Sequence, residues 1–127
     1  MKQLTKAEEQ VMQILWDINE GIVKDVVENF KDPKPAYTTV ATVFKVLENK
    51  GFVTKRKIAN THMYKPLISK EEYTKLQFSS LLKNYFNGSF PKMATFFARE
   101  NNISIHELEE MIKVAENELK KDSPKNQ

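Results

Sequence analysis

The spacing of apolar residues changes abruptly in the middle of this chain. From residue 37 to residue 50 they follow the i, i+3, i+4, i+7 pattern of one buried helix face, at Val40, Val43, Phe44 and Leu47. Gly51 then ends the helix. Residues 52–58 and 62–67 are rich in β-forming side chains and flank a turn at 59–61, which predicts a two-stranded hairpin. Because a lone hairpin is marginal in water, we expect it to pack on the helices through Ile58, Tyr64 and Leu67.

Two further helices precede this segment. Thr5 and Glu8 have the spacing of a capping box, and an apolar helical stripe follows them. Gly21, free to adopt a positive φ, is predicted to end the first helix. A short second helix stops at the prolines of residues 31–35. Three helices followed by a basic hairpin is the order of a winged helix-turn-helix.

The second half of the chain is predicted to be helical throughout. Capping boxes at Ser69–Glu72 and Ser104–Glu107 open a long helix and a last helix, and Ser89 caps a short helix between them. The inward candidates of the long helix are Tyr73, Leu76, Ser80, Leu81 and Phe86. The predicted fold class is therefore mainly α with a small β-hairpin. We expect a winged-helix DNA-binding domain at 1–68, a three-helix dimerisation region at 69–122 and a frayed tail at 123–127.

Composition excludes several classes of function. The 127 residues include no Cys and only two His, which excludes disulfides and thiolate metal sites and makes a multi-His metal site improbable. No Ser/His/Asp constellation or phosphate-binding loop is visible, so we expect neither an enzyme nor a cofactor. No signal peptide or membrane-length apolar stretch appears, and we expect a soluble cytoplasmic protein without membrane insertion.

Charge is distributed unevenly along the chain. Residues 1–33 carry four basic and seven acidic side chains, and residues 69–127 carry nine of each. Residues 34–68 carry seven basic residues and one acidic residue, a net charge of +6. This concentration suggests a polyanionic partner at the third helix and the hairpin. A solvated basic surface is the alternative explanation.

The exposed side of the third helix suits the major groove of DNA. It carries short polar side chains and one cation, at Thr38, Thr42, Lys45 and Asn49. Threonine hydroxyls donate or accept hydrogen bonds at base edges, and Lys45 can reach a phosphate. The hairpin then brings Lys55, Arg56 and Lys57 near the adjacent backbone or minor groove. Strand alternation puts Arg56 on the opposite face from the two lysines, so all three need not touch DNA.

Apolar side chains of the last two helices predict a dimer. Three helices of this size make a thin core, and a symmetric partner would complete it. The candidate dimer residues are Met93, Phe96, Phe97, Ile103, Leu108, Met111, Ile112 and Leu119. Helices folded back onto the winged helix are the alternative.

These motifs resemble the penicillinase-repressor family of winged-helix regulators. The strings AYTTVATV at 36–43 and LENKGFV at 47–53 look like its recognition-helix signature, and LTKAE at 4–8 is similar to the start of its first helix. The resemblance implies a bacterial homodimeric repressor of a roughly palindromic operator. Carried over by position, Thr38, Thr39 and Thr42 would read bases, and Lys34, Tyr37 and Lys45 would hold the backbone or flank the site. The wing would comprise or border Lys55, Arg56, Lys57, Asn60 and His62.

The sequence departs from the family pattern in two places. Antibiotic-responsive members are cleaved at an Asn-Phe bond in the short C-terminal helix, where this chain has Thr95, Phe96 and Phe97. Release by a sensor-protease is therefore doubtful. Copper-responsive members bind metal through a C-terminal cysteine cluster, which this chain lacks, and His106 beside Glu107 is a poor metal pair.

Two other functions stay open at this point. A winged helix can serve as a protein-interaction module, in which case its threonine-bearing side would be covered by protein. A regulator that senses a small molecule would need a pocket, for which the candidate aromatic residues are Tyr73, Tyr85, Phe86 and Phe90.

Overall fold

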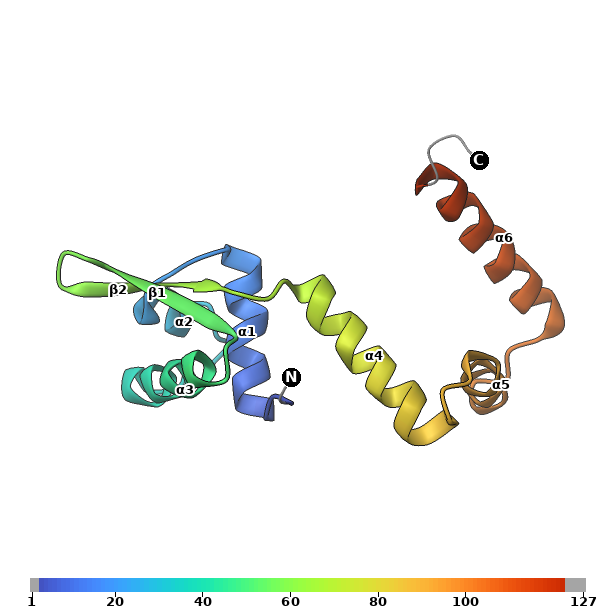
Figure 1. Cartoon of the computed structure of the whole chain (residues 1–127), viewed down its shortest axis with the longest axis horizontal. Coiled ribbons are helices and arrows are strands. Elements are labelled where there is room, and N and C mark those ends of the chain that lie inside the picture. Colours follow the sequence, from blue (N-terminus) through green and yellow to red (C-terminus); the bar gives the residue numbers. More distant parts are fainter. Residues whose placement is uncertain (1–2, 123–127) are drawn as a thin grey trace. The chain divides into compact units, whose positions relative to one another are not determined.

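The protein is mainly helical, with a single antiparallel hairpin among the residues that the structure describes. This computed structural model describes residues 3–122 (Figure 1). The elements run in the order α1 (Lys6–Ile18), α2 (Val23–Glu28), α3 (Tyr37–Asn49), β1 (Val53–Ile58), β2 (Thr61–Pro66), α4 (Lys70–Phe86), α5 (Phe90–Glu100) and α6 (Ile105–Asp122). The predicted fold class is thus confirmed. The frayed tail predicted at 123–127 lies outside the described residues.

The chain divides into two compact units, Met1–Gln77 and Phe78–Gln127. This division falls within α4, and the functional boundary expected between residues 68 and 69 stays a prediction. The first turn of α4 packs on the first unit through Tyr73, whose ring lies 5.8 Å from that of Trp16 and 5.6 Å from that of Phe52, centroid to centroid. Of the predicted inward residues of α4, Tyr73 is buried, Leu76, Ser80 and Leu81 are exposed, and Phe86 is half-buried.

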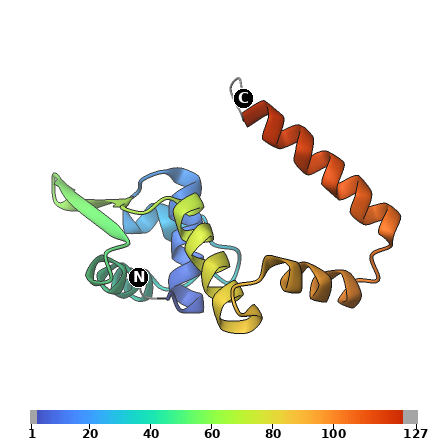
Figure 2. The ribbon, with the colours of Figure 1, turned by 45° about the vertical axis from the view of Figure 1, so that its right-hand side comes forward.

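The first unit is built around one hydrophobic core. Helices α1, α2 and α3 each contribute one apolar face to it, and Phe52 and Val53 close it below the hairpin. The largest fully buried side chains are Phe44, Phe52, Met12, Leu15 and Leu47. Figure 2 shows the turn of the hairpin projecting away from these helices. The core therefore fixes the buried side of α3 and leaves the outer part of the hairpin in solvent.

Tyr64 attaches the hairpin to the helices. Its ring stacks on Phe44 with centroids 4.1 Å apart, and its backbone pairs with Gly21 through hydrogen bonds of 3.0 and 2.8 Å. Gly21 thus adds a one-residue bridge beside β2. The predicted positive φ at Gly21 is wrong, because Asn19 adopts that conformation, with φ of 73°. Gly21 instead occupies a tight site, since an added Cβ would lie 2.8 Å from Ile18 Cδ1 and 3.2 Å from Asp25 Cβ, and the Ile18 side chain would have to shift.

The other two hairpin residues expected to pack inward do not. Ile58 is 45% exposed because it pairs with Thr61 at the far end of the hairpin, beyond the helices. Leu67 is 60% exposed, since its neighbour Ile68 is the residue that enters the core. The expectation of inward packing is therefore correct for Tyr64 alone.

The second unit has helices without a closed core. Its aromatic residues meet in two pairs, Phe78 with Phe90 at 6.2 Å and Phe86 with Phe96 at 5.7 Å between ring centroids. None of its described side chains is buried. Large apolar side chains of α5 and α6 are therefore left in solvent.

Local capping fixes the starts of the helices in both units. Thr5–Glu8, Ser69–Glu72 and Ser104–Glu107 each form the two reciprocal hydrogen bonds of a capping box, at 3.0–3.3 Å. The Ser89 hydroxyl accepts a hydrogen bond from the Lys92 amide at the start of α5. The predicted helix starts are thus confirmed.

Candidate nucleic-acid interface

Helix α3 has one buried side and one exposed side. Val40, Phe44 and Leu47 point into the core of the first unit. The opposite side is exposed and carries Thr38, Thr42, Lys45 and Asn49, which we call the threonine face, with Thr39 exposed beside it. Four residues spaced at i, i+4, i+7 and i+11 form one continuous strip along a helix. Short polar side chains thus lie along the accessible side of a well-anchored helix.

The start of α3 has no acidic residue in its first turn and no side-chain cap at Ala36. The positive end of the helix dipole is therefore not neutralised locally, which favours an anionic neighbour there. Tyr37, the first residue of α3, is 57% exposed and stands at this end. Because threonine and valine are poor helix formers, packing on the core must stabilise this helix.

The hydroxyl proton of Thr42 is already engaged. Thr42 Oγ1 donates to the carbonyl oxygen of Thr38 at 2.9 Å. The Thr42 oxygen can still accept a hydrogen bond, and its methyl group stays available for apolar contact. Thr74 makes the same bond to the Lys70 carbonyl in α4, so the geometry is that of an ordinary helical threonine.

The strand register sorts the wing residues onto two faces. Lys55 pairs with Tyr64 and Lys57 pairs with His62, so these four share the face that Tyr64 turns toward α3. Lys55 Nζ lies 3.2 Å from the Glu48 carboxylate of α3. Asn60 is exposed in the turn. Lys57, Asn60 and His62 are thus accessible on the outer part of the wing.

Arg56 lies on the other face of the hairpin. It pairs across the strands with Met63, and its Nη1 donates to Glu20 Oε1 at 2.8 Å. Hydrogen bonding from the guanidinium, together with its charge, lowers the pKa of the Glu20 carboxyl. The same contact raises the pKa of Arg56. The sequence predicts the separation of Arg56 from the two lysines but gives no sign of its partner.

Lys34 is held by the backbone of the first unit. Its Nζ donates to the Glu28 carbonyl at 3.0 Å and to the Phe30 carbonyl at 2.6 Å. These are carbonyls at the C-terminal end of α2, where a cation satisfies unpaired acceptors. A phosphate would have to compete with both carbonyls for this amino group.

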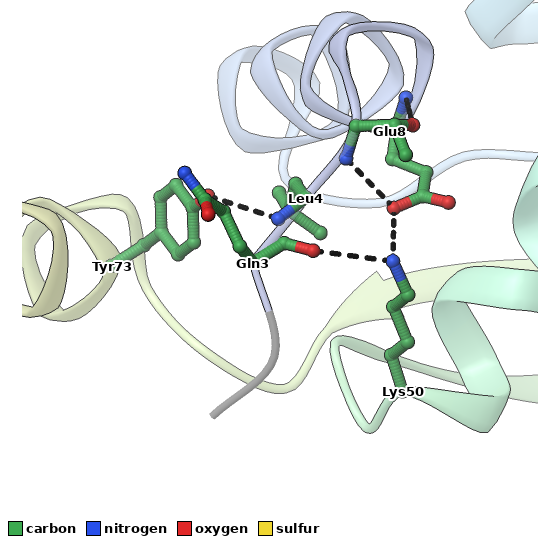
Figure 3. A network of polar contacts seen from close by, with 6 residues as sticks. Gln3, Leu4, Glu8, Lys50 and Tyr73 are labelled. Carbon is green, nitrogen blue, oxygen red and sulfur yellow. Dashed lines mark hydrogen bonds and ion pairs between the residues drawn. The ribbon is translucent and has the colours of Figure 1, made fainter.

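A partly buried ion pair fixes the C-terminal end of α3. Lys50 Nζ lies 2.6 Å from Glu8 Oε1 and also donates to the Gln3 carbonyl at 3.2 Å (Figure 3). Desolvation acts to raise the pKa of the Glu8 carboxyl, but hydrogen bonds from Lys50 and Thr5 and the charge of Lys50 outweigh it, so the pKa lies below its usual value. The spacing of Thr5 and Glu8 predicts their cap, whereas Lys50 lies 42 residues away and no local pattern indicates it.

The N-terminal segment in Figure 3 also meets α4. The amide of Leu4 donates to the Tyr73 hydroxyl at 3.4 Å, which is a long hydrogen bond. Trp16 Nε1 donates to the Ile68 carbonyl at 2.9 Å in the same region. Residues 3–8 therefore contact both the end of α3 and the start of α4.

The predicted dimer residues lie in the second unit at varying exposure. Met93, Ile103 and Leu108 are half-buried. The other five are 49–67% exposed: Phe96, Phe97, Met111, Ile112 and Leu119. Their pairing with a second copy stays a prediction.

The four aromatic residues expected to line a ligand pocket differ in their exposure. Tyr73 is a core residue of the first unit, where burial raises the pKa of its hydroxyl. Tyr85 is 76% exposed, Phe90 is 55% exposed and Phe86 is half-buried. Tyr73 thus belongs to an aromatic core, and an aromatic ligand pocket stays a prediction.

Within residues 3–122 no group of three or more His, Asp or Glu side chains has the arrangement of a metal site. His106 is exposed in the first turn of α6. Across the same residues, no helix is both long enough and apolar enough to cross a membrane.

Three helices, a hairpin docked by Tyr64 and an exposed polar face on α3 are the arrangement of a winged helix-turn-helix protein. The penicillinase repressor family model matches residues 4–117, and the chain belongs to this family. It is 24% identical over 115 residues to a penicillinase repressor of Bacillus licheniformis, covering 90% of each chain.

A second relative is similarly distant. The chain is 23% identical over 112 residues to the methicillin resistance regulatory protein MecI of Staphylococcus aureus, covering 86% of this chain and 89% of that protein. Membership of this family makes the chain a transcriptional repressor and not an enzyme.

Proposed function

We propose that this repressor binds a pseudo-palindromic DNA operator as a homodimer. The observation that carries the proposal is the threonine face of α3, which is exposed along its length while the opposite side is locked into the core. A helix anchored in this way can enter a major groove without rearrangement. The basic segment 34–68, with a net charge of +6, lies on the same helix and hairpin.

In this proposal α3 is the recognition helix. Thr38, Thr39 and Thr42 contact base edges through hydroxyl and methyl groups. Lys45 and Tyr37 flank them and contact the DNA backbone. Asn60, His62 and the basic run Lys55, Arg56 and Lys57 form or border the wing, which lies beside the adjacent DNA backbone.

The dimer follows from the second unit. Its described side chains form no closed core, and its exposed apolar residues include Ile112 and Leu119 on α6. A second copy of the chain is the partner that would cover them. Two recognition helices in a symmetric dimer then meet half-sites spaced by about one helical turn or a multiple of it.

The test is selection of bound fragments from a genomic DNA library, followed by affinity measurements at physiological salt. We expect recovered fragments to share an inverted repeat and to bind at least about a thousandfold more tightly than random duplex. Equal affinity for recovered and random fragments would contradict sequence-specific binding. A shared motif without inverted symmetry would contradict the dimeric arrangement.

Helix α5 differs from the antibiotic-responsive members of the family at the position of their Asn-Phe cleavage bond. The position of the Asn-Phe bond is occupied by Thr95, Phe96 and Phe97, and both phenylalanines are 55% exposed on α5. Cleavage at an Asn-Phe bond therefore has no substrate there.

A further inference from the structure

The outer part of the wing has little to hold it in place. Beyond the pair of Lys55 and Tyr64, every residue of the hairpin is exposed except Met63, which is half-buried. Ile58, the apolar residue nearest the turn, is 45% exposed. A two-stranded hairpin without a packed face is marginal in water, so contacts outside the core must set its position.

One contact occurs just beyond the pair of Lys55 and Tyr64. Arg56 follows Lys55 in β1, and its guanidinium reaches back to Glu20 in the segment between α1 and α2. The two residues are 36 positions apart, so the contact joins the wing to a different part of the first unit. On the opposite face, Lys55 contacts Glu48 of α3. One ion pair therefore lies on each face of the hairpin.

The Glu20 carboxylate also makes Arg56 a poor phosphate ligand. It lies 2.8 Å from the guanidinium and would repel an approaching phosphate. Arg56 further lies on the face away from Tyr64 and α3. Lys57, by contrast, is exposed on the face of Tyr64, and the structure shows no ion pair for it within residues 3–122.

We propose that Glu20 and Arg56 are positioning residues that hold the wing beside α3, and that Lys57 makes the phosphate contact of the wing. The inference rests on the proposed function, because it assigns roles within the same DNA interface. It divides the basic run 55–57 into one cation that meets DNA and two that fix the hairpin.

The decisive experiment exchanges the two charges. Affinity for the tightest duplex from the library selection is measured across a salt series with the full chain. The variants are Arg56→Glu, Glu20→Arg, the double variant carrying both changes, and Lys57→Ala. The double variant has the same net charge as the parent chain, so long-range electrostatics are matched.

A positioning role predicts recovery in the double variant. Arg56→Glu should weaken binding at least fivefold, and the double variant should return to within about twofold of the parent chain, with an unchanged salt dependence. A surface ion pair has modest strength, so Arg56→Ala should weaken binding only about two- to fivefold. Lys57→Ala should lower the slope of log K against log salt by about 0.9. A double variant as weak as Arg56→Glu would overturn the inference, because position 56 would then need a cation for DNA.

A second measurement needs no DNA. Hydrogen exchange of the Met63 and Thr61 amides, which belong to the hydrogen-bonded pairs of the hairpin ladder, should accelerate in Arg56→Ala and in Glu20→Gln, and stay unchanged in Lys57→Ala. Unchanged exchange in the first two variants would overturn the anchoring role. If exchange accelerates in these two variants but no duplex is bound selectively, the proposed function fails while the anchoring of the wing by Glu20 and Arg56 stands.

Discussion

Thr42 is the residue where the proposed base reading is most directly tested. Its hydroxyl donates to the Thr38 carbonyl, its oxygen can still accept a hydrogen bond, and the residue is exposed. Thr42→Ala should reduce discrimination between the selected operator and a single-base variant by about 1–3 kcal/mol, measured by competition binding.

Thr74→Ala is the matched control for that change. Thr74 is also exposed and bonds to the carbonyl four residues earlier, but it lies on α4. It should leave discrimination unaltered. An equal loss in both variants would assign the effect to helix stability rather than base contact.

The pair of Glu8 and Lys50 makes stability depend on pH. Because the folded-state pKa of Glu8 is lowered, the unfolded chain binds more protons between the two pKa values. The contribution of Glu8 is therefore fully present above its ordinary pKa of 4.5 and is lost as pH falls through the lower folded value. Urea unfolding from pH 7 to pH 3 should show this fall in the parent chain and a flatter profile in Glu8→Gln.

Removing the cation of Lys50 should lower the free energy of unfolding more than removing the charge of Glu8 does. Lys50→Met leaves a carboxylate with 9% of its side chain exposed and no cation beside it. We expect the free energy of unfolding at pH 7 to fall by about 3 kcal/mol. A fall below about 0.5 kcal/mol would mean that water replaces the lysine.

At the scale of elements, the bridge of Gly21 with Tyr64 sets how closely the segment after α1 approaches the hairpin. Gly21→Ala places a Cβ 2.8 Å from Ile18 Cδ1 and 3.2 Å from Asp25 Cβ. We expect it to destabilise the fold by about 1–2 kcal/mol in urea unfolding. Adding Ile18→Val removes the closer contact and should restore part of the loss. If the second change restores nothing, the approach to Asp25 or the hairpin itself is responsible.

At this scale the sequence predicts the features that depend on residues close together in the chain. The capping boxes, the buried side of α3 and the alternation of the wing all depend on residues a few positions apart, and each could be predicted. The expected inward packing of Ile58 and Leu67 is wrong, because Ile58 lies at the far end of the hairpin and Ile68, not Leu67, enters the core. The partners of Arg56 and Lys50 lie 36 and 42 residues away, and no local pattern indicates them.

At the scale of the whole molecule, the exposed stripe of α6 tests the dimer. Ile112 is 58% exposed and lies on the predicted stripe with Met111 and Leu119. Ile112→Glu should raise the dimer dissociation constant at least tenfold, about 1.4 kcal/mol, in sedimentation measurements. The loss should arise because a carboxylate would be desolvated at the interface.

Asn117→Glu provides the control for this change. Asn117 is exposed on the same helix and lies about 140° from Ile112, on the side away from the stripe. This variant should leave the dimer dissociation constant unchanged in the same sedimentation measurements. A monomeric parent chain, or equal effects of the two variants, would contradict the proposed dimer face.

The burial of Tyr73 has a practical consequence for exchanging modules between regulators. A hybrid that joins residues 3–77 to an unrelated dimerising helix retains the ring that covers Trp16 and Phe52. A hybrid joined after residue 68 loses that ring and exposes two large aromatic side chains to water. A hybrid that replaces the second unit should therefore be joined after Gln77, about two turns into α4.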